Sequence, residues 1–97
     1  MAIESVLAVG AQPVTTACDF YQPDSVQGPM FQVLEGVDAE HAAGEADMLM
    51  TAVQDLLEDS METGGMSTHL TGLCRFALDA AQALHAAAGR GTKRALA

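Results

Sequence analysis

The stretch DAEHAAGEADMLMTAVQDLLEDSMETGGMSTHLTGLCRFALDAAQALHAAA, residues 38–88, decides the fold of this chain. Apolar residues recur in it every three or four positions on both sides of Gly64-Gly65. This spacing is typical of amphipathic α-helices, and paired glycines interrupt them. Because the connection is short, the two helices must run antiparallel. The stretch therefore predicts a mainly α-helical protein built on a helical hairpin.

The first predicted helix covers residues 38–63. Asp38 is its expected N-cap, because an aspartate carboxylate can accept hydrogen bonds from the free N–H groups of the first turn. The apolar stripe is about 140° wide at ~100° per residue, which is more than one partner helix covers. The opposite face carries acids and has no Lys or Arg. We expect it to be the partner-binding surface, made of Glu40, Asp47, Asp55, Glu58, Asp59 and Glu62.

The second predicted helix covers residues 67–88, with Ser67 as N-cap and Gly89 beyond its end. A two-helix unit of about 50 residues buries too little surface to be stable alone. We therefore expect a homodimer in which two hairpins form an antiparallel four-helix bundle with isologous contacts. The predicted core and dimer seam consists of Leu49, Val53, Leu56, Leu57, Leu70, Leu73, Phe76, Ala77 and Leu84.

The segment before the hairpin is predicted to be extended or partly disordered over residues 1–29, because Pro and Gly recur in it. Phe20-Tyr21 could dock on the rest of the chain as an aromatic clip. The hairpin domain covers residues 30–89 and begins with a strand at 30–35. The sequence offers no convincing second strand. The strand could pair with its copy in a dimer, or lie extended on the helices.

The charge is strongly negative, with a formal net charge of -9 over 97 residues. Arg90, Lys93 and Arg94 belong to residues 90–97, which we predict to be a basic mobile tail. Direct binding of nucleic acid is not expected, because phosphate neutralisation requires a basic surface. The acidic body fits solubility or a basic protein partner.

Cysteine usage and hydropathy indicate the compartment. Cys18 and Cys74 are far apart and do not resemble a disulfide framework, which favours a reducing cytoplasm. Cys74 falls on the core-facing stripe, where a buried free thiol is expected. No run approaches the roughly 18 apolar residues of a membrane span, so no membrane association is predicted.

The residues that could carry chemistry do not form a recognised constellation. His41, His69 and His85 do not share a helix face at i, i+4, as zinc ligands on helices would. The Gly-rich segments lack the spacing of a phosphate-binding loop. We therefore expect no metal, no cofactor and no catalytic residue, and we predict that the protein is not an enzyme.

One motif resembles a known family. The order F-x-V-x-x-G-V at Phe31–Val37 is followed by an Ala-rich amphipathic helix, a break, and a second helix containing Ala-Gln-Ala-Leu at 81–84. This order resembles a family of short uncharacterised proteobacterial proteins of the pseudomonad type. The resemblance covers roughly residues 30–88. It implies a small, cytosolic, helical, self-associating protein with no established activity and no catalytic residue to carry over.

Two functional hypotheses follow. The first is a small acidic, non-enzymatic protein–protein interaction or regulatory protein that acts as a homodimer. The alternative is an acidic inhibitor or nucleic-acid mimic, of the phage or mobile-element anti-defence type, that blocks a basic groove on a partner. The run of acids without a base from Glu40 to Glu62 motivates this alternative. A third possibility is a regulatory subunit whose first 29 residues order on a partner.

Overall fold

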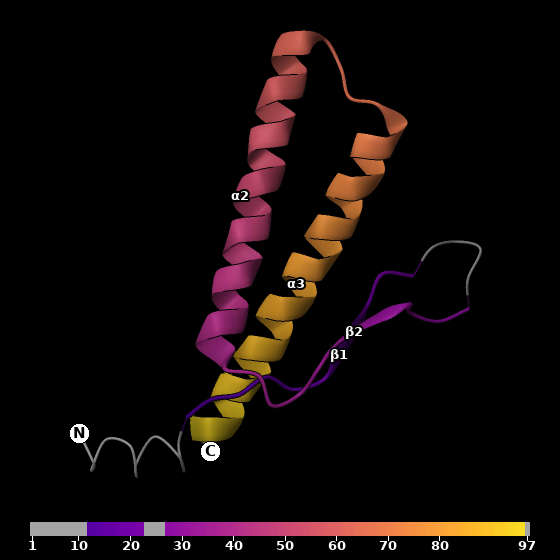
Figure 1. Cartoon of the computed structure of the whole chain (residues 1–97). Coiled ribbons are helices and arrows are strands. Elements are labelled where there is room, and N and C mark those ends of the chain that lie inside the picture. Colours follow the sequence, from indigo (N-terminus) through magenta and orange to yellow (C-terminus); the bar gives the residue numbers. More distant parts are fainter. Residues whose placement is uncertain (1–11, 23–26, 97) are drawn as a thin grey trace.

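The computed structural model describes residues 12–22 and 27–96. Two long helices, α2 (Ala39–Thr63) and α3 (Thr68–Leu96), form an antiparallel hairpin. Two short strands, β1 (Cys18–Phe20) and β2 (Phe31–Val33), lie beside the C-terminal half of α3 (Figure 1). The predicted mainly helical hairpin with a short β lead-in is therefore confirmed. The predictions for residues 1–11 and 23–26 lie outside the described residues.

Helix α2 begins and ends where its capping residues require. The Asp38 carboxylate accepts a hydrogen bond from the His41 N–H at 3.3 Å, as an N-cap does. Gly64 has φ 89°, and its N–H donates to the Ser60 carbonyl, so the last turn closes in the left-handed conformation that glycine adopts without strain. The predicted helix at 38–63 is confirmed.

Helix α3 begins as expected but ends later. Ser67 accepts a hydrogen bond from the Leu70 N–H at 3.2 Å and is the predicted N-cap. The predicted end at Ala88 and the predicted mobile tail at 90–97 are wrong, since the helix continues through both glycines to Leu96. Local glycine signals favoured termination, and tertiary contacts with the preceding segment override them.

Those contacts come from residues 13–17, which we call the strap. The strap crosses α3 at Gly91, where a Cβ atom would overlap the carbonyl group of Val14. Arg90 Nε donates to Thr16 Oγ1 at 3.0 Å, and the Thr16 N–H donates to the Ala87 carbonyl at 3.2 Å. Gly91 is therefore the residue that lets two backbones meet, and Arg90 is tied down instead of mobile.

The strap is also joined to the loop that precedes α2. Buried Thr15 donates through Oγ1 to the Leu34 carbonyl at 2.6 Å and accepts from the Val37 N–H at 3.0 Å. Its own N–H donates to the Val37 carbonyl at 2.7 Å. One threonine thus holds the N-terminal segment, the loop and the start of the hairpin together.

The expectation that the chain has no second strand is wrong. β1 pairs antiparallel with β2 in the register Cys18↔Val33, Asp19↔Gln32 and Phe20↔Phe31. The predicted strand 30–35 is also too long, because only three residues pair before Gly36 turns the chain at φ 87°. β1 escaped detection because a three-residue strand between prolines carries no measurable alternation; its partner and α3 decide it.

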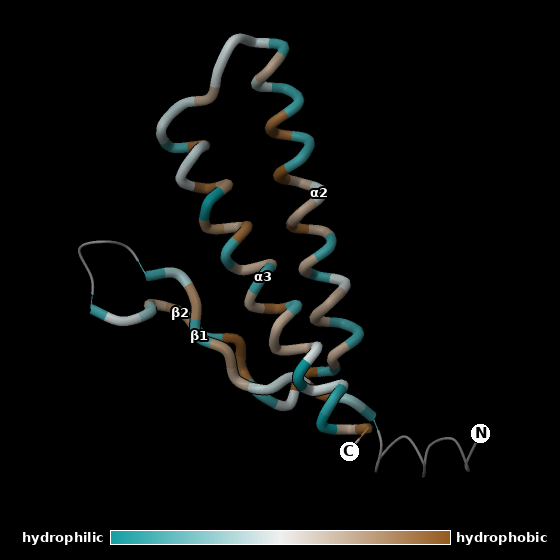
Figure 2. The backbone as a smooth tube through the Cα atoms, turned by 180° about the vertical axis from the view of Figure 1, so that it is seen from behind, coloured by the Kyte–Doolittle hydropathy of each residue, from teal (hydrophilic) through white to brown (hydrophobic). Residues whose placement is uncertain are grey.

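The core of the hairpin is built largely from alanine. The buried apolar residues of the two helices are Ala39, Ala42, Ala46, Val53, Cys74, Ala80, Ala81, Ala83, Ala87 and Ala88. Small side chains allow the helices to approach closely near the strap. The helices diverge towards the Gly64-Gly65 loop, and hydrophobic and hydrophilic positions alternate along both (Figure 2). Cys74 is free and buried, as predicted.

Within the described ranges, no helix is long and apolar enough to cross a membrane.

Candidate interaction surfaces

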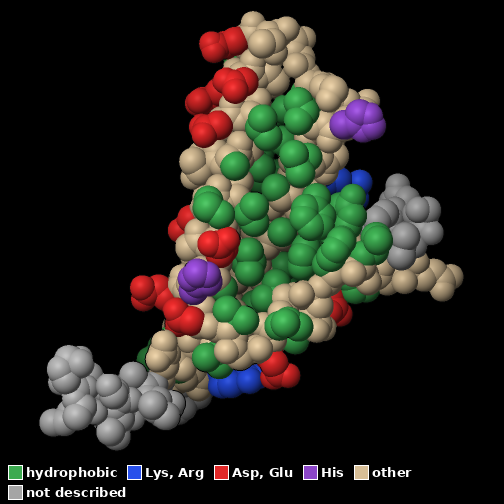
Figure 3. Space-filling model, viewed as in Figure 1, with side chains coloured by type: hydrophobic (Ala, Val, Ile, Leu, Met, Phe, Trp, Pro, Cys, Tyr) green, Lys and Arg blue, Asp and Glu red, His purple; other side chains and the backbone are tan. Residues whose placement is uncertain are grey.

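The acidic surface follows the outer side of α2. All six predicted partner-binding acids are exposed, namely Glu40, Asp47, Asp55, Glu58, Asp59 and Glu62. Figure 3 shows acidic side chains along the edge of α2 that faces away from α3. The structure therefore places these residues on a single helix surface that a partner could reach.

One of these acids has a partner that sequence reasoning missed. Nε2 of His85 lies 3.1 Å from Oδ1 of Asp47, and the two side chains are 44% and 73% exposed. Such an exposed pair contributes little to stability. A signal was available, because both residues lie 19 positions from Met66. An antiparallel hairpin centred on that residue brings them level.

The predicted seam residues divide according to their position in the hairpin. Val53 is buried, while Leu49, Leu56, Phe76, Ala77 and Leu84 are partly buried. Leu57, Leu70 and Leu73 remain 47%, 40% and 54% exposed in the single chain. A band of hydrophobic side chains accordingly runs along the hairpin between the helices (Figure 3).

The hairpin has two broad faces, and the first carries the strands. There, Leu34 and Val37 line an apolar groove of ≈ 320 Å³ together with His41 and Glu45 of α2 and Leu84 of α3. We call this the sheet-side face. Its most exposed apolar residue is Leu34, at 66%.

The second face lies on the other side of the hairpin. At ~100° per residue, Met50, Leu57 and Met61 lie within about 40° of one another, roughly opposite to His41 and Glu45. None of the three lines the groove. This flank of α2 is therefore turned away from the strands.

Helix α3 contributes to the second face through His85, because this residue reaches Asp47 there. Leu78, two turns earlier, lies within about 20° of His85 on the helix and is 40% exposed. The strands contact α3 elsewhere, where Val33 packs with Ala83 and Ala87. We call the second face the open face and define it by Met50, Leu57, Met61, Leu78 and His85.

Phe20 and Tyr21 dock as the aromatic clip that the sequence suggested. Phe76 of α3 lies 5.1 Å, centroid to centroid, from both Tyr21 and Phe31, and the rings meet edge to face. Phe20 stacks on Phe31 at 5.7 Å. Tyr21 has φ 62°, a strained value for a residue with a side chain, and the cluster holds it there. These rings join the sheet to α3.

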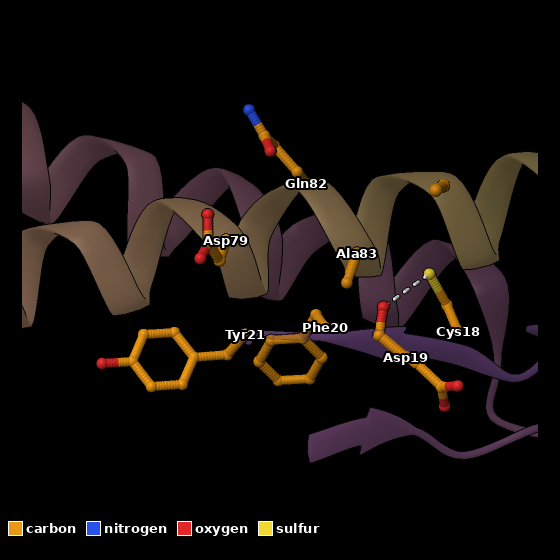
Figure 4. Close-up of a pocket in the computed structure, with 8 residues that line it drawn as sticks. Cys18, Asp19, Phe20, Tyr21, Asp79, Gln82 and Ala83 are labelled. Atoms are coloured by element: carbon orange, nitrogen blue, oxygen red, sulfur yellow. Dashed lines mark hydrogen bonds between the residues drawn. The ribbon is translucent and has the colours of Figure 1, made fainter. Parts of the chain in front are cut away.

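A shallow hollow lies next to this cluster (Figure 4). Cys18, Asp19 and Tyr21 line it from the β1 side, and Asp79 and Gln82 from α3. The Asp19 and Asp79 carboxylates point apart, and Cys18 Sγ is directed at the Asp19 carbonyl, 3.7 Å away. The lining supplies neither a base for the thiol nor a pair of carboxylates that could share a proton.

Among residues 12–22 and 27–96, no three His, Cys, Asp or Glu side chains lie close enough together to hold a metal ion.

Comparison with family models, with curated proteins and with solved structures finds no match to this chain. The resemblance of Phe31–Val37 and the hairpin to the proteobacterial family therefore remains a prediction.

Proposed function

We propose that this chain is a small, acidic, non-enzymatic interaction or regulatory protein of the cytoplasm that acts as a homodimer. In the dimer, two hairpins complete an antiparallel four-helix bundle. The acidic surface of α2 is then left to a basic protein partner.

One observation carries this proposal. The hairpin buries alanines and exposes large aliphatic residues: Ala46 and Ala87 are 0% exposed, whereas Leu57, Leu73 and Met61 are 47%, 54% and 82% exposed. A stable monomer does the reverse, because burying a leucine is worth about 1.5–3 kcal/mol and burying an alanine much less. Each half-exposed leucine leaves about 1 kcal/mol unrealised, and a second hairpin would supply the missing contacts.

Size-exclusion chromatography with light scattering tests the proposal. At micromolar concentration the mass should be twice the 10.1 kDa of the chain. The dimer should dissociate on dilution, and its thermal unfolding should depend on concentration. A strict monomer throughout this range would exclude the homodimer.

A second function is favoured by the exposed acids at the distal end of α2. Asp55, Glu58 and Glu62 are exposed, and no Lys or Arg among the described residues forms an ion pair with them. Such a surface suits an inhibitor that imitates nucleic acid and occupies a basic groove.

Replacing Asp55, Glu58 and Glu62 by Lys distinguishes the two functions. The inhibitor function requires this variant to lose binding to a basic partner, and the wild-type binding to weaken steeply with salt. Under the homodimer function alone, the variant still folds and dimerises.

A further inference from the structure

We propose that the open face, rather than the sheet-side face, is the surface on which the second copy packs. This inference rests on the proposed homodimer and assigns its interface. It commits to one occupant, a second copy of this chain related by a twofold axis.

The open face is apolar along the hairpin. Met50, Leu57 and Met61 follow one another at spacings of seven and four residues on α2. They are 41%, 47% and 82% exposed, and Leu78 on α3 is 40% exposed. This is the seven-residue repeat by which antiparallel helices interdigitate in bundles. The side chains that the hairpin fails to bury are therefore arranged as a helix-packing surface.

The charges of the chain permit two copies to approach on this face. At ~100° per residue, the six exposed acids of α2 lie between about 80° and 200° from Leu57, on the outer side of the helix. The ionisable group among the defining residues is His85, whose ring already faces the Asp47 carboxylate at 3.1 Å. Two copies with a net charge of -9 each would repel through most orientations. Packing through the open face directs most of their acids sideways into solvent.

The shape and area also fit a second copy. The described strands lie on the other face, so the open face can meet a flat surface of its own kind. The 25 residues of α2 form a rod about 37 Å long, and two helices side by side are roughly 20 Å wide. The resulting area, about 700 Å² per copy, is close to the roughly 800 Å² that each partner contributes to a standard stable interface.

In this arrangement the sheets and the aromatic rings lie on the two outer sides of the bundle. The groove beside Val37 and Glu45 stays accessible in each copy. Contacts are isologous, so each substitution on the open face acts twice per dimer.

The test uses two substitutions matched in chemistry and exposure but placed on different faces. Leu57→Asp lies on the open face, and Leu73→Asp lies on the flank of α3 that continues towards Phe76 and the strands. Their side chains are 47% and 54% exposed, so neither should unfold the single chain. Sedimentation velocity measures the dimer dissociation constant, and circular dichroism checks the helix content. Met61→Asp is a second open-face variant, and at 82% exposure it carries the least risk to folding.

We expect Leu57→Asp and Met61→Asp to raise the dissociation constant by at least about a hundredfold, because each places two carboxylates in an apolar interface. Leu73→Asp should change it by less than about fivefold. If Leu73→Asp dissociates the dimer while the open-face variants remain dimeric, this inference is overturned and the homodimer stands with the sheet-side face as its interface. A wild-type monomer would overturn the homodimer itself.

Discussion

Replacing Gly91 by Ala should destabilise the protein, although helix propensity predicts the opposite. Alanine is about 1 kcal/mol more favourable than glycine inside a helix. The new methyl group, however, would occupy the position of the Val14 carbonyl. That carbonyl belongs to backbone, which cannot rotate away as a side chain could, so the strap must leave α3.

The hydrogen bonds of the strap set the size of the effect. Displacing it breaks the bond from the Thr16 N–H to the Ala87 carbonyl and the bond from Arg90 to Thr16. It also strains the bonds that tie Thr15 to the loop. Two or three hydrogen bonds at about 1 kcal/mol each amount to about 2–3 kcal/mol. Subtracting the propensity gain of about 1 kcal/mol leaves a net loss of about 1–2 kcal/mol.

Gly89→Ala is the matched control. Gly89 lies two residues earlier on the same helix and is exposed, and a Cβ atom added to it would have nothing within 4 Å. The substitution should therefore stabilise the protein by about 0.5–1 kcal/mol. Urea unfolding followed by circular dichroism, at one fixed protein concentration, measures both variants. If Gly91→Ala stabilised the protein as much as Gly89→Ala does, the close crossing of the strap over α3 would be refuted.

Three further substitutions test the other contacts by the same unfolding measurement. Thr15→Val keeps the shape but removes a buried hydroxyl that both donates and accepts, and should cost about 1–3 kcal/mol; an unchanged midpoint would mean that the strap is not held there. Gly64→Ala forces a methyl-bearing residue into φ 89° and should cost about 1–2 kcal/mol, whereas a neutral result would contradict the left-handed cap. His85→Gln removes the exposed contact with Asp47 and should change monomer stability by less than about 0.5 kcal/mol; a larger loss would show that the pair is structural.

Most of the candidate interaction surface could be predicted from the sequence, because exposure along a helix follows from a regular period. The acids from Glu40 to Glu62 fell on the outer side of α2 as that period required. The burial of the seam residues could not be predicted in the same way. Leu73 and Val53 both lie on apolar stripes, but one is 54% exposed and the other 3%, since the helices diverge towards the loop.

The aromatic cluster shows a similar division. Phe20-Tyr21 could be recognised as residues in search of a docking site, because large rings are costly to expose. That Phe76 is their partner depends on where β1 lies against α3.

The sequence by itself determined the two helices and the boundaries at Asp38, Gly64 and Ser67. These are local matters, decided by hydrophobic period and by capping groups within one turn of each end. Only the tertiary structure decided that α3 runs on through Gly91 and that a second strand exists. Both depend on a segment more than 70 residues away along the chain from the end of α3, where Arg90 meets Thr16. Backbone contacts over such separations leave no periodic trace in the sequence, so a glycine that looks like a helix end becomes a crossing point.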